Sequence, residues 1–203
     1  MNHGILSFST DILALEREKQ WKSAAELAYQ QWASNSQSIN LLCCAGTEIW
    51  CALLEIEYEF APAKISGREF DDTRILQTLL WEVASYGEKH FAENANFNAY
   101  FGYMYNVMPY YFNGYNGDYT GFQKWGQTMM RKAYKLDPGN LFAAAMAYSN
   151  GEPSNFIRAC RVFWNKITPT QWGTGEVAEY FFHILNGPLF FPDAYKDSST
   201  EAT

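Results

Sequence analysis

Three glutamates are spaced so that they fall on one side of a predicted helix. Glu48, Glu55 and Glu59 are seven and four residues apart within residues 39–60, where apolar residues recur at helical spacing. Like charges one turn apart destabilise an isolated helix by about a few tenths of a kcal/mol. Such a row is therefore typical of a solvated face or of a surface with a cationic partner. We interpret it as an acidic ridge that binds lysine and arginine side chains of another protein.

Three further carboxylates follow this ridge in the sequence: Glu57, Asp71 and Asp72. We include Asp71 and Asp72, which open the next predicted helix, among the partner-binding residues. Two other interpretations of these carboxylates stay open. One is an ordinary solvated helix face, and the other is a catalytic acid and base of the glycosidase type.

Aromatic residues crowd the segment 97–122, which Pro109 and several glycines interrupt. Because exposed tyrosines are typical of recognition surfaces, we predict that Tyr110, Tyr111 and Tyr115, beside the glycine-rich loop, are anchors for a protein partner. A sugar-stacking platform is one alternative. The other is the packing of a helix-pair core, in which hydroxyl groups reach the surface.

The histidines and glutamates of the sequence do not occur at the spacing of the usual metal-binding motifs. His90 and Glu93 are three residues apart, and Glu179 and His183 are four apart, so each pair would share a helix face. A di-iron bundle needs two Glu-x-x-His units with further inward glutamates, and no H-E-x-x-H motif is present. We predict no metal site.

Nucleophilic and phosphate-binding motifs are also missing from the sequence. It contains no G-x-S-x-G, no G-x-x-x-x-G-K-[ST] and no G-x-G-x-x-G. Cys43 and Cys44 lie in an apolar helical segment, where inert packing is the usual role of a thiol. We therefore predict no catalytic residue and no cofactor, and we expect that the protein is not an enzyme.

Composition and charge limit the kinds of partner that the protein is expected to bind. The chain has 203 residues and a net charge of −7, and it has no run of basic residues, so nucleic acid is not an expected partner. Neither a signal peptide nor an apolar run of about 18 residues is evident. None of the four cysteines forms a C-x-x-C pair. We predict a cytoplasmic protein that does not bind membranes.

Helical periodicity dominates the chain, and no segment combines strand-like alternation with hairpin turns. We predict an all-α fold of antiparallel helix pairs, with a single helical domain over residues 1–192 and a polar, frayed tail over 193–203. Thr10 is the expected N-cap of the first helix, with a break near residues 18–20. The predicted helices span 10–34, 39–60, 71–93, 97–108, 120–136, 140–149, 153–166 and 173–186.

The segment 110–140 resembles a tetratricopeptide repeat. Gly114, Gly126, Ala133 and Pro138 are separated by twelve, seven and five residues, and M-R-K-A-Y-K-L-D-P-G-N resembles the second helix and exit turn of that motif. Gly126 stands where alanine is usual, and Gly117 where an aromatic residue is. The resemblance implies a degenerate array of the tetratricopeptide type.

The phrase W-G-T-G-E-V-A-E-Y-F-F-H-I-L-N-G, residues 172–187, is similar to helices of bacterial immunity proteins of toxin–immunity pairs, of the contact-dependent inhibition type. This resemblance implies a non-catalytic inhibitor that binds a toxin domain, encoded by the adjacent gene and often a basic nuclease. A helical enzyme acting on a glycan and a peptide-binding tetratricopeptide adaptor are the alternatives. The oligomeric state stays open.

Overall fold

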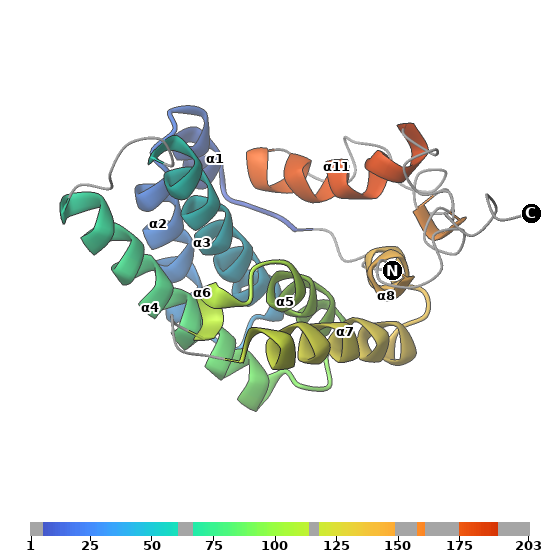
Figure 1. The fold of residues 1–203 in the computed structure, drawn as a ribbon. Helices are drawn as coiled ribbons and strands as arrows, with labels where there is room; N and C mark the ends of the chain where they lie inside the picture. Colours follow the sequence, from blue (N-terminus) through green and yellow to red (C-terminus); the bar gives the residue numbers. More distant parts are fainter. Residues whose placement is uncertain (1–5, 61–66, 114–117, 149–157, 161–174, 191–203) are drawn as a thin grey trace, which may run out of the picture.

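Helices make up the whole regular structure of the residues that the computed structural model describes, which are 6–60, 67–113, 118–148, 158–160 and 175–190. The all-α fold class is therefore confirmed, and Figure 1 shows the arrangement of the helices. In chain order they are α1 (Thr10–Arg17), α2 (Trp21–Ser34), α3 (Ile39–Phe60), α4 (Gly67–His90), α5 (Ala95–Val107), α6 (Tyr110–Asn113), α7 (Tyr119–Leu136), α8 (Leu141–Tyr148) and α11 (Glu176–Phe190).

The first two helices are separate, as the sequence predicts, because the chain turns at Lys19, whose φ is 56°. The predicted N-cap is wrong by one residue. Ser9, in an extended conformation, accepts a hydrogen bond from the amide of Ile12 and caps α1, and Thr10 is the first helical residue. Ser and Thr are both good caps, so backbone conformation decides between the two neighbours.

Helix α3 is the centre of the molecule. Residues 42–53 are all buried, because α2, α4, α5 and α11 all contact this helix. Its segment Ile39–Glu57 has a mean hydropathy of 1.5 over a window that is 67% buried inside the protein. The expectation that no apolar run reaches the length of a membrane span is thus wrong. Burial on all sides is also typical of a core helix, and the absence of membrane binding stays a prediction.

Helices α5 and α7 pack with their backbones in close approach. A Cβ on Gly126 would lie 2.4 Å from the carbonyl oxygen of Gly102, so glycine is required at this crossing. Asn140, after α7, donates to Asn96 near the start of α5, whereas Gln127 donates to Asn106 near its end. The two helices therefore run antiparallel. The tetratricopeptide register stays a prediction, because residues 114–117 lie outside the described structure.

An aromatic cluster joins α11 to the rest of the core. Trp50 of α3, Tyr100 of α5, Phe142 of α8 and Phe181 of α11 are all fully buried. The rings of Tyr100 and Phe142 stack with centroids 4.3 Å apart, and Phe181 packs edge-on against Tyr100 at 5.3 Å. Much of the aromatic content of the sequence therefore serves the core.

Some predicted boundaries differ from the structure. Helix α4 begins at Gly67, four residues before Asp71. Helix α11 continues past Pro188 to Phe190, although the predicted helix ends at residue 186. The tail 193–203 and most of the predicted helix 153–166 lie outside the described residues. The single-domain prediction is not tested.

Candidate functional site

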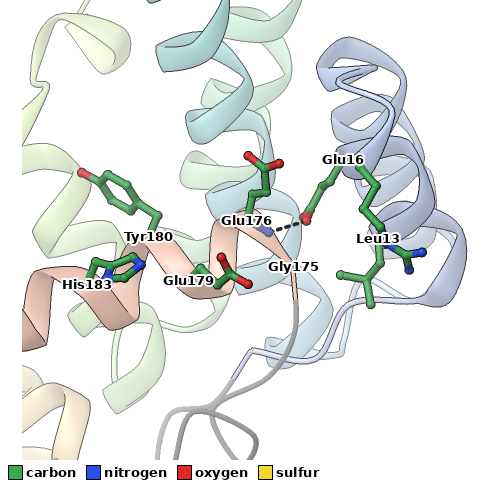
Figure 2. A pocket seen from close by; sticks show the side chains of 8 residues that line it. Leu13, Glu16, Gly175, Glu176, Glu179, Tyr180 and His183 are labelled. Carbon is green, nitrogen blue, oxygen red and sulfur yellow. Dashed lines mark hydrogen bonds between the residues drawn. The ribbon is translucent and has the colours of Figure 1, made fainter.

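A cavity of about 540 Å³ lies between the C-terminal half of α1 and the start of α11. We call it the α1–α11 cleft (Figure 2). Helical spacing positions its walls, since the residues on each helix are three or four apart and share a face. The lining residues are Leu13, Glu16, Arg17, Gly175, Glu176, Glu179, Tyr180 and His183.

Glu16 ties the two walls of the cleft together. Its Oε2 accepts a hydrogen bond of 2.7 Å from the backbone amide of Glu176, drawn as the dashed line in Figure 2. This amide is one of the unpaired donors at the start of α11, and the helix dipole favours a negative charge there. Glu16 therefore acts as an N-cap supplied from 160 residues away.

Gly175 permits this contact. Its φ is +111°, a conformation that side chains disfavour. A Cβ at this position would lie 2.5 Å from Oε2 of Glu16 and 2.4 Å from a methyl carbon of Leu13. The carboxylate can approach the helix end because this residue has no side chain.

Behind Glu16 lies a second buried carboxyl group, that of Glu48 on α3. Both residues have 0% exposure. If both were ionised, neither oxygen of Glu48 nor Oε1 of Glu16 would have a donor among the described residues. One proton resolves this, because a protonated Glu48 donates a hydrogen bond to the Glu16 carboxylate. The pair is a carboxyl–carboxylate hydrogen bond.

Burial and mutual repulsion determine which group keeps the proton. Burial, together with the negative charge of Glu16, raises the pKa of Glu48 well above its usual value. Burial also raises the pKa of Glu16, but its hydrogen bonds from Glu48 and the Glu176 amide oppose that rise. Of the two carboxyl groups, Glu48 therefore keeps its proton to the higher pH.

The rim of the cleft is negatively charged. Glu176 and Glu179 are exposed, and among the described residues no lysine or arginine lies within 4.0 Å of either carboxylate. Arg17 and His183 are the basic residues of the lining, and both are exposed. Three glutamates thus line the cavity together with one arginine and one histidine.

A smaller cavity of about 230 Å³ adjoins the cleft, sharing Glu176 and Tyr180 with it. Cys51 and Glu55 of α3 contribute to its wall. Burial raises the pKa of the Cys51 thiol well above its usual value, and nearby carboxylates add to the rise. The thiol is therefore neutral and a poor nucleophile.

The predicted acidic ridge is wrong at its first member, Glu48. Glu48 faces the interior because α3 is covered on all sides at that level. Glu55 is half-buried and lines the smaller cavity, whereas the side chain of Glu59 lies outside the described structure. The three glutamates do not form an exposed row.

The two predicted aspartates lie apart from the cleft. Asp71 is exposed, with Oδ1 4.0 Å from a guanidinium nitrogen of Arg74. Asp72 is half-buried and forms a 2.6 Å ion pair with Lys22 of α2. Neither lines the two cavities.

Of the three predicted tyrosine anchors, the structure contradicts one, Tyr111. Tyr111 is fully buried and therefore cannot anchor a partner; its backbone carbonyl accepts from the indole of Trp81. Tyr110 is half-buried and donates to Glu57 over 3.2 Å. Tyr115 lies outside the described residues.

The cleft residues were missed because nothing local in the sequence connects them. Glu16 and Glu176 meet only in the folded chain. One signal was available, since Glu16 follows Ile12 by four residues on the buried face of α1, and a glutamate at a core position needs a partner. Glu179 and His183 do share a face, but among the described residues no group of three or more His, Cys, Asp or Glu side chains is arranged to hold a metal ion.

Comparison with known proteins adds no identification. The chain matches no protein-family model, no curated protein and no solved structure. The chemistry of the cleft therefore carries the functional argument.

Proposed function

We propose that this protein is a non-catalytic, cytoplasmic immunity-type protein, which binds a basic toxin domain and neutralises it. In this proposal the α1–α11 cleft binds a basic side chain of the toxin domain. The binding carboxylates are then those of Glu176 and Glu179 at the cleft and not those of the acidic ridge. The expected partner is still a cationic protein.

The observation that carries the proposal is the negative charge at the opening of the α1–α11 cleft. Glu176 and Glu179 are exposed at a cavity of about 540 Å³, and among the described residues no lysine or arginine lies within 4.0 Å of either carboxylate. A cationic side chain that enters the cavity would meet these two carboxylates.

Long-range electrostatics support the same partner class. The net charge of −7 attracts a basic domain and accelerates encounter. The exposed carboxylates of Glu176 and Glu179 stand at the opening of the cavity. Their position would attract a cation to this opening.

Complex formation with the product of the adjacent gene tests the proposal. The two chains are co-expressed, and gel filtration with light scattering then measures the mass of the assembly. We expect a stoichiometric complex in which the activity of the partner is suppressed. Two chains that elute separately, with undiminished activity of the partner, would contradict the proposal.

A glycan-acting enzyme is the alternative that the sequence left open. Glycosidases hold their two carboxyl groups about 5–9.5 Å apart, on either side of the scissile bond, whereas Glu48 and Glu16 are fully buried and share a hydrogen bond, so this pair does not support the enzyme. Release of reducing sugar from a panel of oligosaccharides distinguishes the two candidates. Turnover that disappears in Glu16→Gln would favour the enzyme, whereas complex formation without turnover favours the inhibitor.

A further inference from the structure

We propose that the outer face of helix α7 binds a short acidic segment of another protein, and that apolar side chains of this segment pack on Trp125. The proposal goes beyond the proposed function, because α7 does not line the α1–α11 cleft and attracts charge of the opposite sign. We call this surface the α7 face and define it by Lys124, Trp125, Arg131, Lys135 and Leu136.

Helix α7 is positively charged in a protein that is otherwise strongly acidic. Its 18 residues include four lysines and arginines and no aspartate or glutamate. The helix therefore has a charge of +4 and the rest of the chain a charge of −11, which together give the net charge of −7. A local positive field of this kind attracts an anionic partner to one surface of the molecule.

Three of these cations form one exposed stripe. Lys124, Arg131 and Lys135 are seven and four residues apart, so helical geometry places them on one side of α7 over about 16 Å. All three are exposed, and among the described residues no carboxylate lies within 4.0 Å of their charged groups. Gly126 and Met129, on the opposite side, contact α5, and Figure 1 shows α5 between α7 and α3. The stripe therefore faces away from the core.

Exposed apolar side chains flank the stripe. Trp125 is 52% exposed and Leu136 is 38% exposed, and both lie about a quarter turn round the helix from the stripe. Trp125 also borders two cavities, one of about 350 Å³ with Phe122 in its wall and one of about 140 Å³ with Met129 in its wall. Exposed tryptophan beside arginine is typical of residues that dominate the binding energy of protein interfaces. Apolar side chains of a partner would enter these cavities and cover Trp125.

The boundaries of the stripe favour a short anionic segment over a long polyanion. Exposed carboxylates stand at both ends of α7, that of Asp118 before it and that of Asp137 after it, and Glu88 lines both cavities beside Trp125. A nucleic-acid strand carries a phosphate at every nucleotide, so beyond the stripe it would meet these carboxylates. A protein segment can confine its carboxylates to about 16 Å, the length of the stripe, and can place apolar side chains opposite Trp125 and Leu136.

The test uses a capped helical peptide of about 15 residues, long enough to span the stripe. The peptide has glutamates at spacings of seven and four residues and leucines on the adjoining side, and a matched peptide has glutamine in place of every glutamate. Amide NMR shifts of Thr128 and Arg131 are followed during titration. We expect a saturable shift with the acidic peptide and an affinity for the glutamine peptide that is weaker by at least about threefold.

Two variants remove the charged and the apolar part of the α7 face separately. Arg131→Gln should weaken the acidic peptide by about twofold to fivefold and leave the glutamine peptide unchanged, a difference that a folding defect would not produce. Trp125→Ala should weaken both peptides by at least about fivefold. Arg74→Gln is the charge-matched control, because Arg74 is exposed on α4 with Asp71 as its neighbour, and it should leave both affinities unchanged.

Other occupants of the α7 face are separate outcomes of the same test. Tighter binding of an oligothymidylate of about ten nucleotides, or of vesicles that contain phosphatidylserine, would overturn the proposal in favour of nucleic acid or a membrane surface. A dimer in light scattering that Arg131→Gln dissociates would assign the face to a second copy of the chain. Equal affinity for the two peptides, no saturable shift with the acidic peptide, or equal effects of Arg131→Gln and Arg74→Gln would also overturn the proposal. None of these results depends on whether the toxin complex forms.

Discussion

At the scale of single residues, the burial of Glu48 beside Glu16 makes the stability of the protein depend on pH. An unfolded chain titrates Glu48 near its ordinary value of 4.5, whereas burial holds its folded-state pKa well above that. Between the two values the folded state binds a proton that the unfolded state has lost. Stability therefore falls as pH rises through this window, which is the opposite of the usual effect of a salt-bridged carboxylate.

The first prediction concerns Glu48→Gln. The amide can donate to Glu16 without titrating, so the variant should unfold at a nearly constant temperature from pH 5 to pH 8. The wild-type protein should lose up to about 1.4 kcal/mol of unfolding free energy per pH unit within that range, as linkage requires for one proton. Thermal denaturation followed by circular dichroism measures both.

Glu93→Gln, an exposed carboxylate, controls for the change in net charge and should keep the pH slope of the wild type. A wild-type unfolding temperature that rises from pH 5 to pH 8, or a Glu48→Gln variant with the wild-type slope, would show that the two carboxyl groups do not share a proton.

The sequence predicted the helices better than it predicted which of their side chains are buried. The spacing of Glu48, Glu55 and Glu59 placed them on one helix, and that helix exists. The burial of Glu48 was not predictable from periodicity, because a hydrophobic stripe assumes one solvated face and residues 42–53 have none. Tyr111 was misjudged for a related reason, since proximity to a glycine-rich loop says little about which way a ring points.

At the scale of elements, two glycines allow helices to make their closest contacts. Gly126 lets α7 approach α5, and Gly175 lets α11 begin against Glu16. In both places the backbone or a carboxylate occupies the volume that a side chain would need. The tetratricopeptide resemblance singled out Gly126, whereas nothing in the sequence pointed to its neighbour there, Gly102.

Gly126→Ala should destabilise the α5–α7 pair. Its Cβ would lie 2.4 Å from a backbone oxygen, and overpacking of this kind costs about 1–3 kcal/mol. Urea denaturation measures the loss. Gly139→Ala, where the nearest atom is a side-chain oxygen of Asp137 at 3.3 Å, should change stability by less than about 0.5 kcal/mol. Similar effects at the two positions would refute the close approach.

Gly175→Ala tests the attachment of α11 to α1. The residue has a φ of +111°, so alanine should cost about 1–3 kcal/mol of unfolding free energy. Because the new methyl group would displace Glu16 from the Glu176 amide, that amide should also exchange with solvent faster, as NMR hydrogen exchange measures. A wild-type exchange rate at Glu176 would contradict this capping contact.

Capping residues in the local sequence are enough to predict where some of the helices begin. Asp118 caps α7 through the amide of Gly121 and Asn94 caps α5, and both starts lie within two residues of their predictions. The continuation of α11 past Pro188 was not anticipated, because proline usually marks a helix boundary. The contact between Glu16 and Glu176 has no local signature at all.

At the scale of the whole molecule, the net charge of −7 should govern how fast a basic partner arrives. Unpaired exposed charges act over about 30 Å at 0.01 M salt but only about 8 Å at 0.15 M. Stopped-flow measurement of association with the toxin domain should therefore show a rate that falls at least about tenfold between these salt concentrations. An association rate constant that does not change with salt concentration would mean that charge does not guide the encounter.

The most direct test of the account is the dissociation constant of the toxin complex for two charge reversals, measured by isothermal titration calorimetry. Glu179→Lys changes the cleft, and Asp71→Lys makes the same change at an exposed position that does not line it. We predict that Glu179→Lys weakens the complex at least about tenfold while Asp71→Lys changes it less than about threefold. Equal effects of the two substitutions, or a larger effect of Asp71→Lys, would contradict the cleft as the binding site.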